Sequence, residues 1–244
     1  PHIGTDILIE VVERMREEII RLGGEFLFHS QVTDILPKEN CLIVNGCHRI
    51  ETDAAVFAVG HSARDTFQML FDRNVAMKSK SFAIGVRAEH RQDMIDEAMY
   101  GRKERGPLGA AAYKLTAQLE NGRGVYTFCM CPGGYVVNAS SEQGRLAVNG
   151  MSYHDRAGEN ANSAVIVTVT KDDYGSDHPL AGMEFQRRLE KKAWEEGGGN
   201  VPIQRFVDFC TGTISVKTGN VTPNIKGKYV FGNVRNIFPP ELAE

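Results

Sequence analysis

The stretch Ala54–Gly60, AAVFAVG, constrains the fold of this chain more than any other. Its first six residues form a continuous apolar run, which is typical of a strand buried on both faces of a sheet. The pattern that follows, from Ala63 to Phe71, predicts a helix. Ligands of open α/β sheets bind where a buried strand ends and a helix begins, and Gly60 would let a ligand approach the backbone. An ordinary strand-to-helix turn needs the same glycine, and the pattern alone slightly favours that interpretation.

The residues before this run predict an α/β arrangement. Apolar side chains recur at helical spacing over residues 5–22, which indicates an amphipathic helix with one face formed by Leu8, Val12, Met15, Ile19 and Leu22. Asn45-Gly46 is a strong hairpin signal. Short strands are expected over residues 25–29, 31–36, 41–44 and 47–50.

After Asn74 the chain becomes rich in predicted strands separated by Gly and Asn. The strands are expected over residues 82–88, 111–119, 124–130, 135–139, 147–151 and 164–170, with helices over 92–98 and 180–196. The fold class is therefore α/β, or α+β overall. It divides into an α/β domain over residues 1–74 and a β-rich domain with helices over residues 75–244.

Composition excludes several classes of partner. The net charge of −3 gives no electrostatic case for nucleic acid, and no apolar stretch is long enough to span a membrane. Five cysteines without regular spacing favour a reducing cytoplasm. The chain begins at Pro1 and stops in what looks like the start of a helix, so we expect a piece of a longer polypeptide. Its substrate and its oligomeric state are not set by these features.

Two nucleotide-binding signatures are missing from the sequence. No Gly-x-Gly-x-x-Gly follows a predicted strand, and there is no Gly-x-x-x-x-Gly-Lys-Ser/Thr. Taken alone, this chain is not expected to hold a dinucleotide pyrophosphate in the usual way.

Cys129-Met130-Cys131 precedes a Pro-Gly-Gly turn. Two residues at i and i+2 of a strand share a face, so the thiols could form a redox pair or supply two metal ligands. A metal would need Cys210 or His154 in addition. Two small buried side chains are the more common use of such cysteines, and we expect no metal site.

The stretch from Asn149 to Arg156 gathers several kinds of polar side chain. Tyr153 and His154 are candidate acid–base groups, and Arg156 could hold a carboxylate. A hydrated loop is the alternative. Arg87 and His90 end a predicted strand and could face a cleft, although a surface role explains them equally well.

Several long motifs together resemble one family. They are PHIGTD (1–6), AVGHSARDTF (58–67), FAIGVR (82–87), FCMCPGGYVVNASSE (128–142), NGMSY (149–153), GENANSA (158–164) and PLAGMEFQR (179–187). The chain resembles, along nearly all its length, the bacterial uncharacterised FAD-dependent dehydrogenases, relatives of flavoproteins with a glutathione-reductase-like FAD domain. Members of that family carry a Gly-rich segment upstream and an FAD-binding segment downstream, so the resemblance implies a middle fragment.

The resemblance also implies roles for individual residues. Val32 would lie near the adenine of FAD, and the segment with Ala58, Val59, Gly60 and His61 would run beside the cofactor, followed by Ser62 and Arg64. The second domain would face the substrate with residues guessed from their type and position: Arg87, Cys129, Cys131, Tyr153 and His154.

The function expected from the resemblance is that of a fragment of an FAD-dependent oxidoreductase with an unknown small-molecule substrate. FAD belongs to the longer protein, and the isolated chain is expected to bind it weakly or not at all and to be inactive. A non-redox module that binds a ligand or a partner is the alternative. A thiol or metal enzyme built on Cys129 and Cys131 is a third hypothesis.

Overall fold

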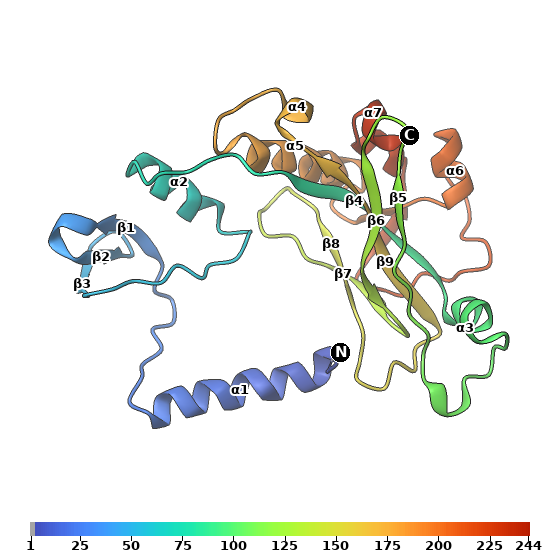
Figure 1. Cartoon of the computed structure of the whole chain (residues 1–244), viewed down its shortest axis with the longest axis horizontal. Helices are drawn as coiled ribbons and strands as arrows, with labels where there is room; N and C mark the ends of the chain where they lie inside the picture. Colours follow the sequence, from blue (N-terminus) through green and yellow to red (C-terminus); the bar gives the residue numbers. More distant parts are fainter. Residues whose placement is uncertain (1–2) are drawn as a thin grey trace. The chain divides into compact units, whose positions relative to one another are not determined.

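The computed structural model describes residues 3–244 (Figure 1). These residues form two compact units. The smaller unit comprises residues 13–80 and 171–184, and the larger unit comprises residues up to 12 together with 81–170 and 185–244. Helices and small, mostly antiparallel sheets make up both units, which confirms the expected α+β class.

The smaller unit contains a three-stranded antiparallel sheet. Its strands are β1 (Val32–Leu36), β2 (Cys41–Val44) and β3 (His48–Glu51), with the short 3₁₀ helix η1 (Pro37–Glu39) between the first two. The turn after β2 lies where Asn45-Gly46 predicted it, and both residues have positive φ, 52° and 76°. Val44 pairs with His48, so the hairpin loop also includes Cys47.

Helix α2 (Arg64–Asp72) packs beside β1 in the same unit. The Arg73 guanidinium, just after the helix, donates through Nε to Asp34 Oδ1 at 2.6 Å. At the other end of the helix the Gln31 amide donates to Asp65 Oδ2 at 2.5 Å. These two polar contacts fix α2 along the first strand. The short helix α4 (Lys171–Tyr174) belongs to the same unit.

Two predicted strands of the smaller unit are absent. Residues 25–29 and 54–59 are in neither helix nor strand, and every residue from 54 to 59 is exposed, with Val56 92% exposed. The expectation of a strand buried on both faces is therefore wrong for this chain. A central strand needs a hydrogen-bonded neighbour on each side, and no strand of the described residues pairs with this run.

Helix α1 (Thr5–Arg21) forms where the periodicity predicts it. It closes at Gly23, which has φ of 89° and donates its amide to the Ile20 carbonyl at 3.0 Å. None of the helix residues is buried. The apolar face therefore stays exposed, at Leu8, Val12, Met15, Ile19 and the following Leu22.

A four-stranded antiparallel sheet forms the centre of the larger unit (Figure 1). Its order is β4 (Phe82–Arg91), β9 (Asn160–Val169), β6 (Gly124–Cys131) and β5 (Thr116–Gln118). A second sheet contains β11 (Ile225–Lys226), β7 (Tyr135–Asn138) and β8 (Val148–Met151), and β8 contacts β4, β6 and β9. Strands β10 (Val201–Ile203) and β12 (Tyr229–Phe231) form a parallel pair.

The apolar core of the larger unit lies where α5 (Ala181–Glu196) meets the second sheet and η3 (Val234–Ile237). Leu146, Ala193, Val201 and Ile237 are buried there, and the Phe185 ring lies 6.3 Å from the Phe82 ring of β4. The remaining elements are α3 (Gln92–Tyr100), η2 (Gly106–Leu108), α6 (Phe206–Thr211) and α7 (Pro240–Ala243). Within residues 3–244 no helix is long and apolar enough to cross a membrane.

The strand predicted over residues 111–119 is much shorter in the structure. Only Thr116–Gln118 pairs, as β5. The Ala111 backbone binds side chains of α3 instead: its amide donates to Asp96 Oδ1 at 2.8 Å and its carbonyl accepts from Gln92 Nε2 at 3.0 Å. At the start of this segment, buried side chains thus satisfy the backbone groups that a neighbouring strand would otherwise pair with.

Candidate functional site

The pairing of β4 with β9 places Arg87 and Asn162 on one face of the sheet. Arg87 lies opposite Ala164, and Glu89 opposite Asn162, so the four side chains share that face. Arg87 Nη1 donates to Asn162 Oδ1 at 2.6 Å. Asn162 is completely buried, and Arg87 is half-buried.

A β-bulge in β6 brings two further acceptors to Arg87. The β6–β9 register shifts between Phe128 and Cys131, and Cys129 has a left-handed φ of 46°. The Cys129 carbonyl accepts from Arg87 Nη1 at 3.1 Å and from the Cys131 thiol at 3.3 Å. Arg87 Nη1 also lies 3.9 Å from Cys131 Sγ. A bulge with a strained non-glycine residue is a common feature of functional sites.

The same bulge corrects the prediction that the two thiols share a face. Cys129 is exposed and Cys131 is buried, because the extra residue turns the chain between them. Burial raises the pKa of the Cys131 thiol, although the Arg87 charge opposes that shift. Within the described residues no three His, Cys, Asp or Glu side chains gather as a metal site would require. The Cys131 thiol therefore lacks the lowered pKa of an activated nucleophile.

Gly150 of β8 makes room for the Arg87 side chain. A Cβ on Gly150 would lie 2.1 Å from Arg87 Nη1 and 2.2 Å from Asn162 Oδ1, so no other residue fits without movement. The neighbouring Asn149 is exposed, and its Oδ1 lies 3.4 Å from Arg87 Nη2. The group formed by Arg87, Cys129, Cys131, Asn149, Gly150 and Asn162 is called the Arg87 cluster below.

The polar groups of the Arg87 cluster are incompletely matched. Among residues 3–244 no carboxylate pairs with Arg87, and no group accepts from Asn162 Nδ2. An unpaired buried donor costs about 1–3 kcal/mol. Rotating the Asn162 side-chain amide by half a turn would break its hydrogen bond to Arg87. Asn162 therefore holds the guanidinium while its own Nδ2 stays without an acceptor among residues 3–244.

The opposite face of the same sheet carries a second polar group. His90 Nε2 and the Tyr113 hydroxyl are 2.8 Å apart, and Ser163 hydrogen bonds to Tyr113. Burial lowers the pKa of His90 and raises that of Tyr113, the latter against the effects of Ser163 and the Arg87 charge. His90 therefore does not share a face with Arg87. Sequence reasoning missed Tyr113, which lies in an irregular segment without a motif.

Buried polar contacts hold the Pro132-Gly133-Gly134 turn that follows β6. The Gly133 amide donates to Gln92 Oε1 at 2.9 Å, and Gln92 Nε2 donates to Asp96 Oδ1 at 2.8 Å. Asp96 also accepts from Arg105 Nε at 2.5 Å. Gly133 has φ of 55°, and a Cβ there would lie 2.0 Å from the Arg156 carbonyl oxygen. Arg105 Nη1 donates to that same oxygen at 3.1 Å. The turn after the bulge is therefore rigidly placed.

Tyr153 and His154 lie after β8, and both are exposed. The Tyr153 ring centroid is 5.1 Å from that of Tyr135. The His154 amide donates to Asp6 Oδ1 at 2.9 Å, and its Nδ1 lies 2.7 Å from the Ile3 carbonyl oxygen. These contacts anchor the start of α1. Among the described residues neither side chain forms a hydrogen bond with the Arg87 cluster.

The residues predicted to hold FAD belong to the smaller unit. Val32 begins β1, and Arg64, at the start of α2, is 4% exposed. Between them in sequence, the residues 58–61 are exposed and Ser62 is half-buried, with its Oγ 3.4 Å from His61 Nε2. Gly60 has φ of 73°, and a Cβ there would meet nothing within 4 Å.

These residues do not by themselves fit the requirements of an FAD site. Cofactor sites enclose most of the ligand surface, whereas the segment 54–61 is exposed and pairs with no strand of the described residues. No Gly-rich turn of the pyrophosphate-binding type is present in the sequence.

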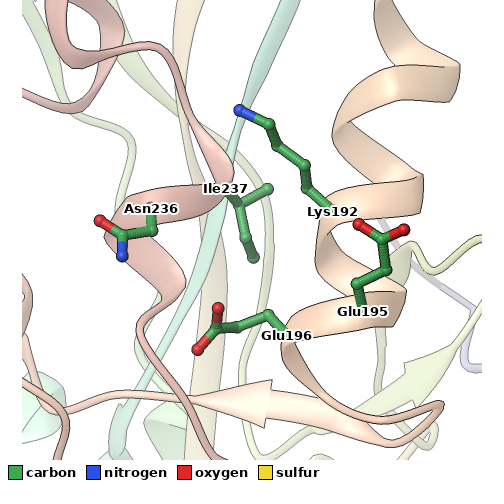
Figure 2. A pocket seen from close by; sticks show the side chains of 5 residues that line it. All are labelled: Lys192, Glu195, Glu196, Asn236 and Ile237. Atoms are coloured by element: carbon green, nitrogen blue, oxygen red, sulfur yellow. The ribbon is translucent and has the colours of Figure 1, made fainter.

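A surface hollow of about 300 Å³ lies between α5 and η3 of the larger unit (Figure 2). Its lining consists of Lys192, Glu195, Glu196, Asn236 and Ile237. Glu196 Oε1 accepts from the Asn233 amide at 2.5 Å and so supports the loop before η3. None of the residues predicted for a site lines this hollow.

Comparisons with known proteins support the FAD-dependent part of the resemblance seen in the motifs. The family described as "FAD-dependent protein, C-terminal domain-like" matches residues 81–244. An uncharacterized protein of Clostridium beijerinckii is 49% identical over 250 residues, covering all of this chain and 47% of the relative. The chain thus spans about half the length of the curated relative it matches. On this evidence the chain belongs to the family of FAD-dependent proteins that share this C-terminal domain.

Proposed function

We propose that this chain is part of an FAD-dependent oxidoreductase, a dehydrogenase of the glutathione-reductase-like type, and that its larger unit supplies the groups that face the substrate. The observation that carries the proposal is the family match over residues 81–244, the same residues that contain the whole Arg87 cluster. In the proposed division, residues 1–74 are part of the FAD domain and residues 75–244 form the second domain. Five free cysteines support a reducing, cytoplasmic setting.

FAD is proposed for the longer protein rather than for this chain alone. The exposed run 54–60 supports this, because an exposed apolar run without a pairing partner is expected where the strands that would cover it are supplied elsewhere. Val32, Ala58, Val59, Gly60, His61, Ser62 and Arg64 are the proposed cofactor contacts once such a sheet is complete. The isolated chain is proposed to be inactive.

The absorption spectrum of the full-length Clostridium beijerinckii relative tests this proposal. The purified protein should show flavin bands, and heat denaturation should release FAD in a one-to-one ratio. A full-length relative that folds and yields no flavin after reconstitution with FAD would contradict the proposal.

The alternative is a module that binds a ligand without redox chemistry. The specific observation that favours it is the Arg87 cluster, whose contacts form entirely within the larger unit and involve none of the proposed FAD-contacting residues. A full-length relative that lacks flavin yet binds an anion at this cluster would establish the alternative.

A further inference from the structure

One part of the Arg87 guanidinium donates hydrogen bonds to the protein, whereas another edge has only one weak acceptor among the described residues. Nη1 donates to the Asn162 Oδ1 and to the Cys129 carbonyl. The other edge consists of Nε and Nη2, and among residues 3–244 its one acceptor is Asn149 Oδ1, at a long 3.4 Å from Nη2. The two N–H groups of that edge are parallel, which is the geometry that a carboxylate accepts from side-on.

The charge of Arg87 is also unbalanced. Arg91, four residues further along β4, pairs with both Asp93 and Glu159. Glu89, on the same face as Arg87, is engaged by Asn160 Nδ2 at 2.8 Å and by the Asn224 amide at 2.7 Å. All acceptors around Arg87 are neutral oxygens or a thiol. A half-buried cation with neutral neighbours favours an anionic ligand.

Three costly features of the fold hold Arg87 in this position. Asn162 leaves its Nδ2 unpartnered within the described residues, Cys129 adopts a left-handed φ, and position 150 must be glycine. Each is unfavourable or restrictive in itself, and all three touch the same guanidinium. Their convergence indicates a site built for a ligand rather than an incidental surface arginine. Cys129 and Asn149, which both contact the guanidinium, are exposed, so the cluster reaches the surface of the larger unit.

We infer that the Nε/Nη2 edge of Arg87 binds a carboxylate, so that the substrate of the proposed oxidoreductase is a small organic acid. That the bound acid is a substrate rests on the proposed function, whereas the binding of a carboxylate by Arg87 does not depend on FAD. A carboxylate fits better than a phosphate because Arg87 is the one cation of the cluster: its two N–H groups meet both oxygens of a carboxylate, whereas the further charged oxygens of a phosphate would have no second cation there.

Benzoate is a suitable probe, because benzamide has nearly the same shape without the charge. The Arg87 Nε–H resonance of this chain should shift saturably with benzoate and remain unchanged with benzamide. Arg87→Gln and Arg87→Lys should each weaken benzoate binding about tenfold or more, since lysine keeps the charge but lacks the fork. Arg102→Gln, which removes the same charge from an exposed loop of the same unit, should have no effect.

A second measurement does not depend on the variants folding. Benzoate should protect Arg87 of the unmodified chain against phenylglyoxal, as followed by mass spectrometry of the peptide that contains it. Equal modification with and without benzoate, or equal protection by benzamide, would overturn the inference. Protection by inorganic phosphate as strong as that by benzoate would replace a carboxylate site with a general anion site and would also overturn it.

The outcomes separate the inference from the proposed function. A full-length relative that contains FAD, combined with no benzoate binding at Arg87, refutes the carboxylate site alone. Benzoate binding at Arg87 combined with a relative devoid of flavin refutes the oxidoreductase and leaves a carboxylate-binding module.

Discussion

Arg87 Nη1 lies 2.6 Å from Asn162 Oδ1, across the pairing of β4 with β9. This bond uses the neutral amide oxygen of a completely buried residue to hold a cation. If the Arg87 cluster binds carboxylates because it has no negative charge of its own, a carboxylate introduced beside Arg87 by substitution should prevent ligand binding.

Asn162→Asp is expected to abolish benzoate binding while the chain remains folded. The new carboxylate would form a buried ion pair with Arg87, which would oppose the binding of a second anion. Titration of the variant with benzoate, followed by the Arg87 Nε–H resonance, measures the effect. Asn121→Asp adds the same charge in the exposed turn between β5 and β6 and serves as the control. Unchanged affinity in Asn162→Asp would be inconsistent with direct binding to Arg87.

Gly133→Ala should destabilise the larger unit by about 3 kcal/mol or more, through a strained φ together with steric overlap. The added Cβ would lie 2.0 Å from the Arg156 carbonyl oxygen. Gly144→Ala is the matched control: Gly144 has φ of 70° and nothing within 4 Å, so its cost should be about 1 kcal/mol. Urea unfolding of both variants gives the comparison. Equal losses of stability would show that the contact with Arg156 does not constrain the turn.

Glu89→Gln should increase stability at neutral and higher pH relative to the unmodified chain. Burial raises the pKa of Glu89 above its ordinary value of 4.5, against the hydrogen bonds from Asn160 and Asn224. The native state therefore holds its proton to a higher pH than the unfolded state does, and the free energy of unfolding falls as pH rises from about 4.5 to the native pKa. Glutamine keeps an oxygen for both donors and carries no charge.

Urea unfolding at a series of pH values tests this assignment. The stability gained by Glu89→Gln should be small at pH values where Glu89 is protonated in both states, and should grow as pH rises through that window. Glu97→Gln, at an exposed position of α3, should show no such trend. A gain that is independent of pH would contradict the raised pKa of Glu89.

The cysteines should fall into two classes of reactivity. Cys47, Cys129 and Cys210 are exposed, whereas Cys41 and Cys131 are buried, and burial raises the pKa of the Cys131 thiol. Titration with a disulfide reagent should therefore show three fast thiols, and Cys129→Ser should remove one of them while the slow class remains. Cys131 reacting as fast as the exposed thiols would revive the hypothesis of thiol chemistry at this bulge.

The sequence predicted local structure well where a segment determines its own form. Helix α1 (Thr5–Arg21) forms within the predicted span 5–22, and β4, β6, β7, β8 and β9 lie where strand patterns occur, because periodicity and turn residues act over a few positions. The prediction of a buried strand over residues 54–59 was wrong for the opposite reason. Burial of this run depends on neighbouring strands, and without them its backbone has no partner for the hydrogen bonds of a sheet.

The Arg87 cluster could be predicted only in part. Arg87, Cys129 and Cys131 were candidates by residue type, and the structure brings them together. Asn162, Gly150 and the bulge at Cys129 were missed as parts of a site, because a one-residue register shift has no signature in a single sequence. Tyr153 and His154 shared a polar stretch with Asn149, yet they contact other residues. Val32, the residues 58–62 and Arg64 remain predictions.

The central claim is tested most directly by titration with FAD, measured by the quenching of its fluorescence. The titration is run in parallel on this chain and on the full-length Clostridium beijerinckii relative, after any bound flavin has been removed. The account predicts saturable one-to-one binding by the full-length protein and no saturable binding by this chain, whose run 54–60 is exposed. Tight binding of FAD by this chain alone, or none by the full-length protein, would contradict it.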